Sequence, residues 1–397
     1  MTTIDTAAAK LPTATLSVLL AVSACHMLND VMQSLLASLY PLLKANYGLD
    51  FVQIGLLTMA FQVTASLLQP AVGVVADRWP MPYALPVGMA STLVGLLLLA
   101  KAGNFAVLVG AACLVGLGSA IFHPEASRVA RLASGGRHGF AQSLFQLGGN
   151  AGTAIGPLLA AFIVLPYGQG SIAWFAGIAL LGMVILTLTG RWYAAHRRLN
   201  AGRPAVSRSL PLPRGDILMA LGILILLTAT KNVYMASFSS YFTFYTIERF
   251  GLSVRDAQLM LFLFLGAAAA GTFAGGPIGD RYGARFVIWF SILGVIPFAL
   301  MLPYANLFFT GVLSVAIGMI LASAFPAIVV FAQELLPGRI GLVAGIFFGF
   351  AFGAGGLGAA LLGTLADSHG IAYVYQVISY LPILGVATIL LPKLARP

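Results

Sequence analysis

Residues 73–80 read GVVADRWP and residues 275–285 read GGPIGDRYGAR, and each segment follows a long apolar run. The pair Asp77-Arg78 recurs 203 positions later as Asp280-Arg281, and at the same offset Gly152 recurs as Gly355. A weak repeat at an interval of half the chain predicts two structurally related halves.

The composition is that of a membrane protein. Hydrophobic residues make up 60% of the 397 residues and charged residues only 8%, against about 25% charged residues in soluble domains. Apolar runs of roughly 20 residues can cross a hydrocarbon core of about 30 Å, and their backbone must be helical in lipid. We predict an all-α integral membrane protein with twelve transmembrane helices near 16–43, 52–76, 82–101, 105–131, 139–165, 170–192, 215–246, 255–279, 284–303, 306–334, 340–366 and 371–392.

The basic residues indicate membrane orientation rather than a nucleic-acid surface, although the net charge is +10. Twelve spans place both termini on one side, and most of the 21 basic residues lie on that side. The other side has only Lys44, Lys101, Arg249 and Arg255. The positive-inside rule therefore predicts a multi-pass protein with both termini in the cytoplasm.

The most polar stretch, AAHRRLNAGRPAVSRSLPLPRGD at 194–216, lies near the middle of the chain. We predict an N-terminal six-helix half at 1–192, a basic cytoplasmic linker at 193–214 and a C-terminal six-helix half at 215–397. Two such repeats are typical of transporters whose substrate site lies between the halves.

Ionisable side chains at membrane depth occur on every third predicted helix. Such groups cost several kcal/mol in a bilayer and usually mark a pathway or a site. They are His26, Asp30, His123, Glu125, Arg128, Lys231 and Glu334. Because the other eight predicted helices carry none, we expect these four helices to line a central cavity.

The first predicted helix carries one polar stripe. His26, Asn29, Asp30 and Gln33 follow the i, i+3, i+4, i+7 spacing of a single helix face. At about 1.5 Å per residue, Asp30 and Lys231 both fall near the membrane midplane. We predict that the stripe faces water or substrate and that Asp30 and Lys231 are partners across the two halves.

The predicted helix at 215–246 presents Lys231 beside Tyr234 and Tyr241, a basic group with aromatic neighbours. On the predicted helix at 105–131, Glu125 and Arg128 share a face, whereas His123 lies about 200° around the helix from Glu125. His123 and Glu125 can both face the cavity only if Pro124 distorts the helix. Gln146, on the predicted helix at 139–165, fits interhelical hydrogen bonding and substrate contact equally.

The paired Asp-Arg segments resemble the Gly-x-x-x-Asp-Arg-x-Gly motif of the major facilitator superfamily, although Pro80 replaces the later glycine in the first copy. In that family the aspartate caps and pairs across the interface between the halves. HMLNDVMQSLLASLYPLL at 26–43, FHPEASRVARLASGGRHGFAQSLFQLGGN at 122–150 and YMASFSSYFTFY at 234–245 also resemble the fosmidomycin resistance branch of Gram-negative bacteria.

The resemblance implies a proton-driven exporter of a small anionic drug, a phosphonate, in the bacterial inner membrane. It implies no cofactor and no metal, and we expect a monomer whose partners are the substrate, protons and lipid. We assign substrate binding to Lys231, Arg128, His26, Asn29, Gln33, Gln146, Tyr234 and Tyr241, proton coupling to Asp30, Glu125 and His123, and a conformational gate to Asp77, Arg78, Asp280 and Arg281.

Two alternatives stay open from the residues. One is an importer or symporter of a sugar, nucleoside or organic acid on the same fold. The other is an intramembrane enzyme with His26, His123 and Glu125 as metal ligands, which the absence of a His-Glu-x-x-His spacing disfavours.

Overall fold

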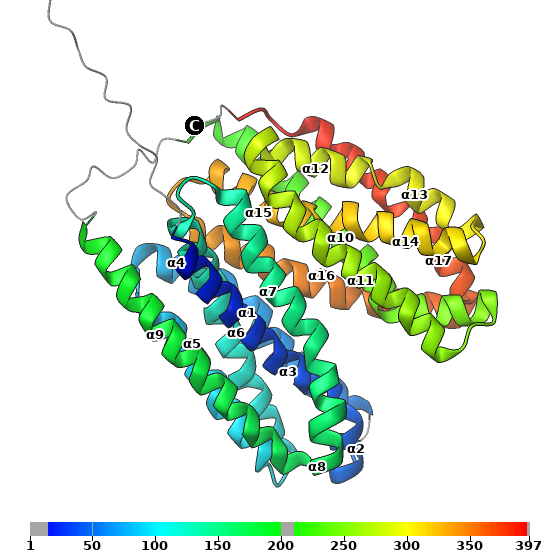
Figure 1. The fold of residues 1–397 in the computed structure, drawn as a ribbon, viewed down its shortest axis with the longest axis horizontal. Helices are drawn as coiled ribbons and strands as arrows, with labels where there is room; N and C mark the ends of the chain where they lie inside the picture. The colour runs from blue at the N-terminus through cyan, green and yellow to red at the C-terminus, as the bar shows by residue number, and fades with distance from the viewer. Residues whose placement is uncertain (1–14, 50, 200–209, 395–397) are drawn as a thin grey trace, which may run out of the picture.

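The computed structural model describes residues 15–49, 51–199 and 210–394 (Figure 1). Within these ranges, eleven helical segments are long and apolar enough to cross a membrane, and Ala84–Ala100 is a shorter apolar helix. These segments correspond one to one with the twelve predicted spans. The all-helical prediction is therefore confirmed.

The first half contains α1 (Leu16–Ser38), α2 (Tyr40–Tyr47), α3 (Phe51–Gln62), the π-helical turn η1 (Val63–Leu67), α4 (Leu68–Arg78), α5 (Ala84–Ala100), α6 (Phe105–Ala133), α7 (His138–Leu159), the π-helical turn η2 (Ala160–Val164), α8 (Leu165–Tyr167), the 3₁₀ helix η3 (Gln169–Trp174) and α9 (Phe175–Leu199). Because α9 continues to Leu199, the first seven residues of the predicted linker, 193–199, are helical. Residues 200–209 of that linker lie outside the described ranges.

The second half contains α10 (Arg214–Phe250), α11 (Val254–Tyr282), α12 (Ala284–Leu293), α13 (Ile296–Met301), the 3₁₀ helix η4 (Leu302–Tyr304), α14 (Leu307–Ala322), α15 (Ala324–Leu335), α16 (Ile340–His369), α17 (Ile371–Ser379) and the 3₁₀ helix η5 (Leu381–Leu390). Some predicted spans consist of two pieces, and their breaks at Leu39 and Ser323 precede Pro41 and Pro326 in the sequence. Proline lacks a backbone N–H, so it favours such interruptions.

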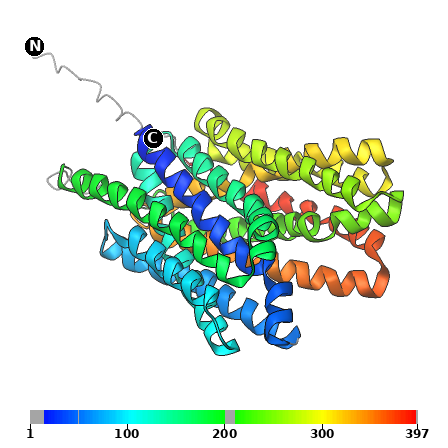
Figure 2. The same ribbon diagram turned by 60° about the horizontal axis from the view of Figure 1, so that its bottom comes forward.

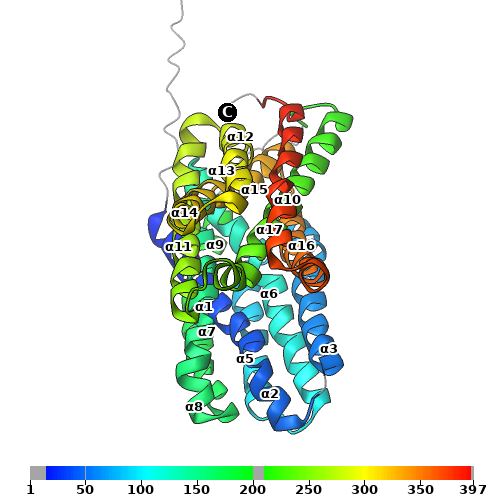
Figure 3. The ribbon, with the colours of Figure 1, turned by 90° about the vertical axis from the view of Figure 1, so that its right-hand side faces the viewer.

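The two helical bundles lie close together at one end and diverge toward the other (Figure 1). The close end is where α9 ends and α10 begins, and we call it the linker end. Figure 2 shows that α1 begins and the described chain finishes at this same end. Figure 3, a view from the side, shows most helices of the second half above those of the first, with the two groups overlapping at mid-height. Both described ends thus lie on one side, as twelve spans require.

The halves meet along two lines of helix contact, which we call seams: α7 against α11, and α4 with η1 against α16. Glycines allow the backbones to approach closely at the linker end. A Cβ on Gly139 would meet the carbonyl oxygen of Gly276, and one on Gly73 would meet that of Gly341. A larger side chain at these positions would force the halves apart.

Candidate functional site

Two histidines and an aspartate converge inside the first half. His26 and Asp30 are one turn apart on α1, and His123 comes from α6. The Nε2 atoms of the histidines lie 3.2 Å apart. Asp30 Oδ2 is 3.4 Å from His26 Nε2, and Asp30 Oδ1 is 3.6 Å from His123 Nε2. All three side chains are buried, so they form a polar cluster in an apolar bundle.

The backbone around the cluster orients both imidazoles. His26 Nδ1 lies 2.8 Å from the Phe145 carbonyl oxygen, and His123 Nδ1 lies 3.0 Å from that of Ser119. A carbonyl oxygen only accepts, so each Nδ1–H donates, although His123 Nδ1 is also 3.2 Å from the Ser119 hydroxyl. Both Nε2 atoms are left facing each other and Asp30. A hydrogen bond between them needs a proton on one Nε2.

The polar stripe of α1 forms a network around Asp30. Asn29 Nδ2 and Gln33 Nε2 donate to Asp30 Oδ1 over 3.1 and 3.2 Å. The predicted pairing of Asp30 with Lys231 is wrong for this conformation, because the ion-pair partners of Asp30 are the two histidines of its own half. Helical spacing along α1 does not fix which neighbouring helix Asp30 faces.

The ligand atoms of His26, Asp30 and His123 all lie within 4.8 Å of one another, which would also allow a metal ion. The sequence predicted no metal. Asp30 Oδ1 already accepts two amide hydrogen bonds, and the Nε2 separation of 3.2 Å suits a shared proton. The geometry of the cluster is thus compatible with a proton shared between the two imidazoles as well as with a metal ion.

Lys231 lies in the second half on α10. Its side chain is only 8% exposed, and its Nζ sits over the Phe325 ring, 4.9 Å from the centroid. In the part of the chain that the structure describes, Lys231 forms no ion pair. One turn further, the buried Tyr234 hydroxyl has no hydrogen-bond partner among the described residues. Two buried donors thus lack an acceptor on one face of α10.

Two aromatic side chains in contact with each other connect Lys231 to the histidine cluster. The Phe325 ring of α15 lies 5.1 Å from the Phe348 ring of α16 in edge geometry. The Phe348 ring in turn lies 5.3 Å from His123. Phe325 and Phe348 are not among the residues singled out from the sequence. The chain has 26 phenylalanines, and nothing in the sequence distinguishes these two from the others as functional residues.

The two motif aspartates cap helices of the opposite half. Asp280 accepts hydrogen bonds from the backbone N–H groups of Gly139 and Phe140, at 2.7 and 2.8 Å, at the start of α7. Asp77 accepts from Gly341 and Leu342, at 2.9 and 2.8 Å, at the start of α16. Both contacts cross the interface at the linker end. The expected capping contact is present in both copies of the motif, including the one with Pro80.

Arg128 lies beside this interface rather than beside Lys231. Its Nη2 donates to Asp77 Oδ1, and its Nε lies 3.2 Å from Glu125 Oε1. Glu125 and His123 are both buried, but one faces Arg128 and the other faces Asp30. The predicted angle of about 200° between the two side chains therefore places His123 with Asp30 and Glu125 with Arg128, on different sides of α6.

The motif arginines do not take part in the interface. Arg78 and Arg281 are exposed and lie over the neighbouring rings of Trp79 and Tyr282. Within the described ranges neither forms an ion pair. Arg131 crosses the interface instead, because its Nη1 donates to Gln333 Oε1 over 3.0 Å. Sequence reasoning did not identify Arg131 or Gln333 as interface residues.

Gln146 and Tyr241, two further predicted substrate contacts, make hydrogen bonds within their own halves. Gln146 Nε2 donates to Asn150 Oδ1, and Asn150 Nδ2 donates to Thr272 Oγ1 of α11, both over 3.3 Å. The Tyr241 hydroxyl donates to the Ala359 carbonyl of α16 over 2.6 Å. Gln146 and Tyr241 therefore make structural hydrogen bonds in this conformation.

Comparisons of the chain with known proteins agree on one family. The family model described as Major Facilitator Superfamily matches residues 22–254 and 221–397. The chain is 59% identical to the fosmidomycin resistance protein of Escherichia coli (strain K12), over 94% of this chain and 92% of that protein. It is 39% identical to the uncharacterized MFS-type transporter YfnC of Bacillus subtilis (strain 168), over 95% and 93%.

Solved structures share the fold at low sequence identity. The human organic anion transporter MFSD10 superposes with a TM-score of 0.77 at 19% identity, over 95% of this chain and 99% of that one. FucP, a major facilitator transporter in the outward conformation, superposes with a TM-score of 0.73 at 15% identity, over 94% and 98%. With the family match and the two relatives, these findings show that the chain is a transporter that belongs to the major facilitator superfamily.

Proposed function

We propose that this transporter exports a small anionic compound of the phosphonate class from the cytoplasm, coupled to protons, with the linker end facing the cytoplasm. The name of the E. coli relative, fosmidomycin resistance protein, supports efflux of a drug. The basic residues of the sequence support the orientation of the linker end.

The observation that carries the proposal is the pair of unsatisfied donors on α10. Lys231 is buried without a counter-ion in the described residues, and Tyr234 is buried without an acceptor. A buried charge of this kind needs compensation from an anion. A phosphonate would accept hydrogen bonds from both groups, with the ammonium supplying the charge.

Proton coupling follows from the histidine cluster. Asp30 and the two Nε2 atoms hold a proton that leaves or enters when the cluster becomes accessible to water. In this conformation Lys231 and the histidine cluster are connected through Phe325 and Phe348, which pack between Lys231 and His123. Substrate that draws Lys231 away from Phe325 would loosen this packing.

The aspartate caps supply the gate. A carboxylate at a helix N-terminus satisfies free N–H groups and is stabilised by the helix dipole. Asp77 and Asp280 hold the linker end closed in this conformation by capping α16 and α7. Breaking both sets of hydrogen bonds would open the substrate path toward the cytoplasm.

Uptake into inverted membrane vesicles with an imposed proton gradient tests the proposal. We expect uptake of a phosphonate such as fosmidomycin, inhibition when the gradient is collapsed, and little uptake of neutral drugs or sugars. Lys231→Gln should reduce phosphonate uptake at least tenfold, whereas the matched control Lys101→Gln, an exposed lysine, should not. Gradient-independent uptake, or equal uptake by both variants, would contradict the proposal. Accumulation in right-side-out vesicles would favour the importer alternative.

A further inference from the structure

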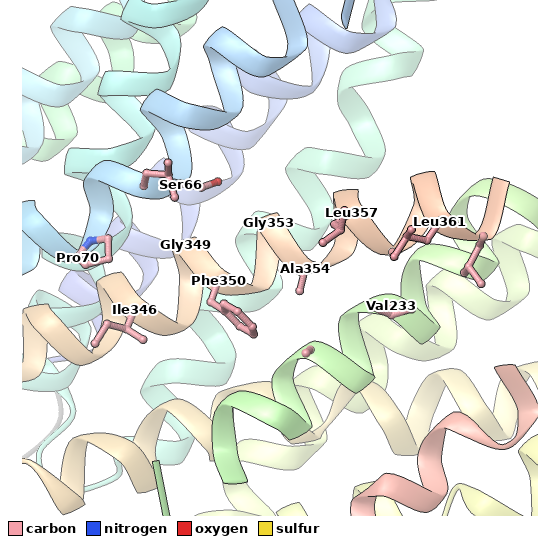
Figure 4. A pocket seen from close by; sticks show the side chains of 14 residues that line it. Ser66, Pro70, Val233, Ile346, Gly349, Phe350, Gly353, Ala354, Leu357 and Leu361 are labelled. Carbon is pink, nitrogen blue, oxygen red and sulfur yellow. The ribbon is translucent and has the colours of Figure 1, made fainter. Parts of the chain in front are cut away.

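A groove runs along the seam where α16 lies between α4 and α10 (Figure 4). Its volume is about 660 Å³, within the range of small-molecule sites. The wall is almost entirely apolar. It is formed by Ser66, Leu67, Pro70, Ala229, Val233 and one face of α16 from Ile346 to Leu362.

The groove is separate from the polar path. Ala229 and Val233 line it from the same face of α10, and Lys231 lies about 200° around the helix from Ala229. None of the lining residues comes from α1, α6 or α15, which carry His26, His123 and Phe325. The helix α10 itself therefore stands between the groove and the proposed anion site.

The composition of the groove favours contact with hydrocarbon over contact with water. Leu67, Leu357 and Leu361 are 71%, 64% and 61% exposed, although they belong to segments long and apolar enough to span the membrane. Apolar side chains exposed at this depth contact lipid. Water in such a groove would find almost no hydrogen-bond partners.

The two seams differ at positions that correspond in the internal repeat. On the α7–α11 seam, Asn150 donates to Thr272 across the halves. The position 203 residues after Asn150 is Gly353, where an added Cβ would meet nothing within 4 Å. Nearer the linker end, a Cβ on Gly345 or Gly349 would clash with the backbone of α4 or η1. The α16 seam is thus tight near the linker end and open beyond Gly349.

We propose that this groove binds one acyl chain of a membrane phospholipid. From Ile346 to Leu362 the wall extends over roughly 24 Å at about 1.5 Å per residue. One leaflet supplies about 15 Å of hydrocarbon, half of a core of about 30 Å. A single chain can therefore lie along α16 with its headgroup at the membrane surface. The inference depends on the seam alone and not on the nature of the exported substrate.

Native mass spectrometry of the purified full-length protein tests the site. The delipidated protein is titrated with palmitoyl-oleoyl phosphatidylethanolamine, and bound lipid is counted. Gly353→Leu places a side chain in the groove without a backbone clash. The matched control Gly266→Leu changes an exposed glycine of α11 that also has open space around it. Leu357→Trp narrows the groove from an exposed position and serves as a second test variant.

We expect the wild-type protein and Gly266→Leu each to retain one more tightly bound lipid molecule than either Gly353→Leu or Leu357→Trp retains. Equal retention by all four proteins would overturn the proposal. A second measurement follows the labelling of Leu357→Cys by a charged, water-soluble thiol reagent in bilayers, which should be slow. Rapid labelling would mean that water fills the groove, and this outcome would also overturn the proposal.

Discussion

Burial of Lys231 costs free energy that Phe325 offsets only in part. A charged group removed from water in a real protein loses several kcal/mol. A cation over an aromatic face recovers about 0.5–2 kcal/mol. Because no carboxylate among the described residues pairs with Lys231, the substrate-free protein holds a charge that an anion can stabilise further.

Replacement of Phe325 should change the affinity for the anion. In Phe325→Leu the ring no longer stabilises Lys231 in the substrate-free state, so we expect phosphonate binding to become tighter by roughly 2- to 30-fold, which corresponds to about 0.5–2 kcal/mol. Isothermal calorimetry measures the change. The control Phe331→Leu alters another buried phenylalanine of α15. Weaker binding in Phe325→Leu would mean that the ring supports the bound anion instead.

Asp30 should matter for coupling more than for folding. Asp30→Asn keeps the size of the side chain but removes the carboxylate that faces both histidines. We expect substrate counterflow to persist and gradient-driven uptake to fall at least tenfold. The control Asp367→Asn changes an exposed carboxylate near the end of α16. Full gradient dependence in Asp30→Asn would remove this residue from the proton path.

The sequence located the important side chains better than it located their partners. The i, i+4 spacing on α1 correctly placed His26 beside Asp30, because one helix fixes that relation. The contact with His123 and the pairing of Arg128 with Asp77 depend on how α1, α4 and α6 are rotated toward one another. No spacing within one helix contains that information.

At the level of elements, the proposed gate depends on two helix N-termini. Removal of a capping side chain typically costs about 0.5–2 kcal/mol, or roughly a 2- to 30-fold change in an equilibrium. Asp77→Ala and Asp280→Ala should each shift the population toward opening of the linker end by about this factor. Alkylation of a cysteine in place of the buried Gln333, which bonds to Arg131 across the interface, measures that opening.

The same motif supplies the controls for the gate. Arg78→Ala and Arg281→Ala remove exposed side chains that cap no helix. We expect alkylation rates close to those of the unchanged protein. Faster alkylation in these arginine variants than in the aspartate variants would reverse the assignment of the gate.

Helix positions were predictable because apolar length is a strong signal. Every predicted span overlaps a helical segment of the structure. The breaks at Leu39 and Ser323 were missed, although a proline follows each of them closely. A proline inside an apolar run can either kink a helix or divide it, and the choice depends on neighbouring helices. The extension of α9 to Leu199 was missed because arginine-rich residues were taken as linker.

At the scale of the whole molecule, the halves carry different chemistry. Positions 229 and 233, which correspond to His26 and Asp30 at the repeat offset, are alanine and valine. Lys231 corresponds in turn to Leu28. The proposed proton site thus belongs to one half and the proposed anion site to the other. Relative movement of the halves is what would couple them.

That movement should respond to a side chain added between the halves. A Cβ at Gly276 would clash with the backbone of Gly139, which cannot yield as a flexible side chain can. Gly276→Val should therefore disfavour the conformation closed at the linker end while leaving the packing within each half intact. The control Gly266→Val adds the same side chain at an exposed site with open space.

Spin-label distances measure this shift directly. Trp79 directly follows α4 and Tyr282 ends α11, each within two residues of a capping aspartate, and both are exposed. Tyr167 ends α8 in the first half and Tyr304 ends η4 in the second half, and both are exposed. In Gly276→Val we expect the distance between labels at the first pair to lengthen and that at the second pair to shorten. If the two halves rock against each other as rigid bodies, separation at the linker end brings the diverging ends closer together. Unchanged distances at both pairs in Gly276→Val would show that the close contact between Gly139 and Gly276 does not control the conformation. A longer distance at the first pair alone would indicate local separation of α7 and α11 instead of rocking of the two halves.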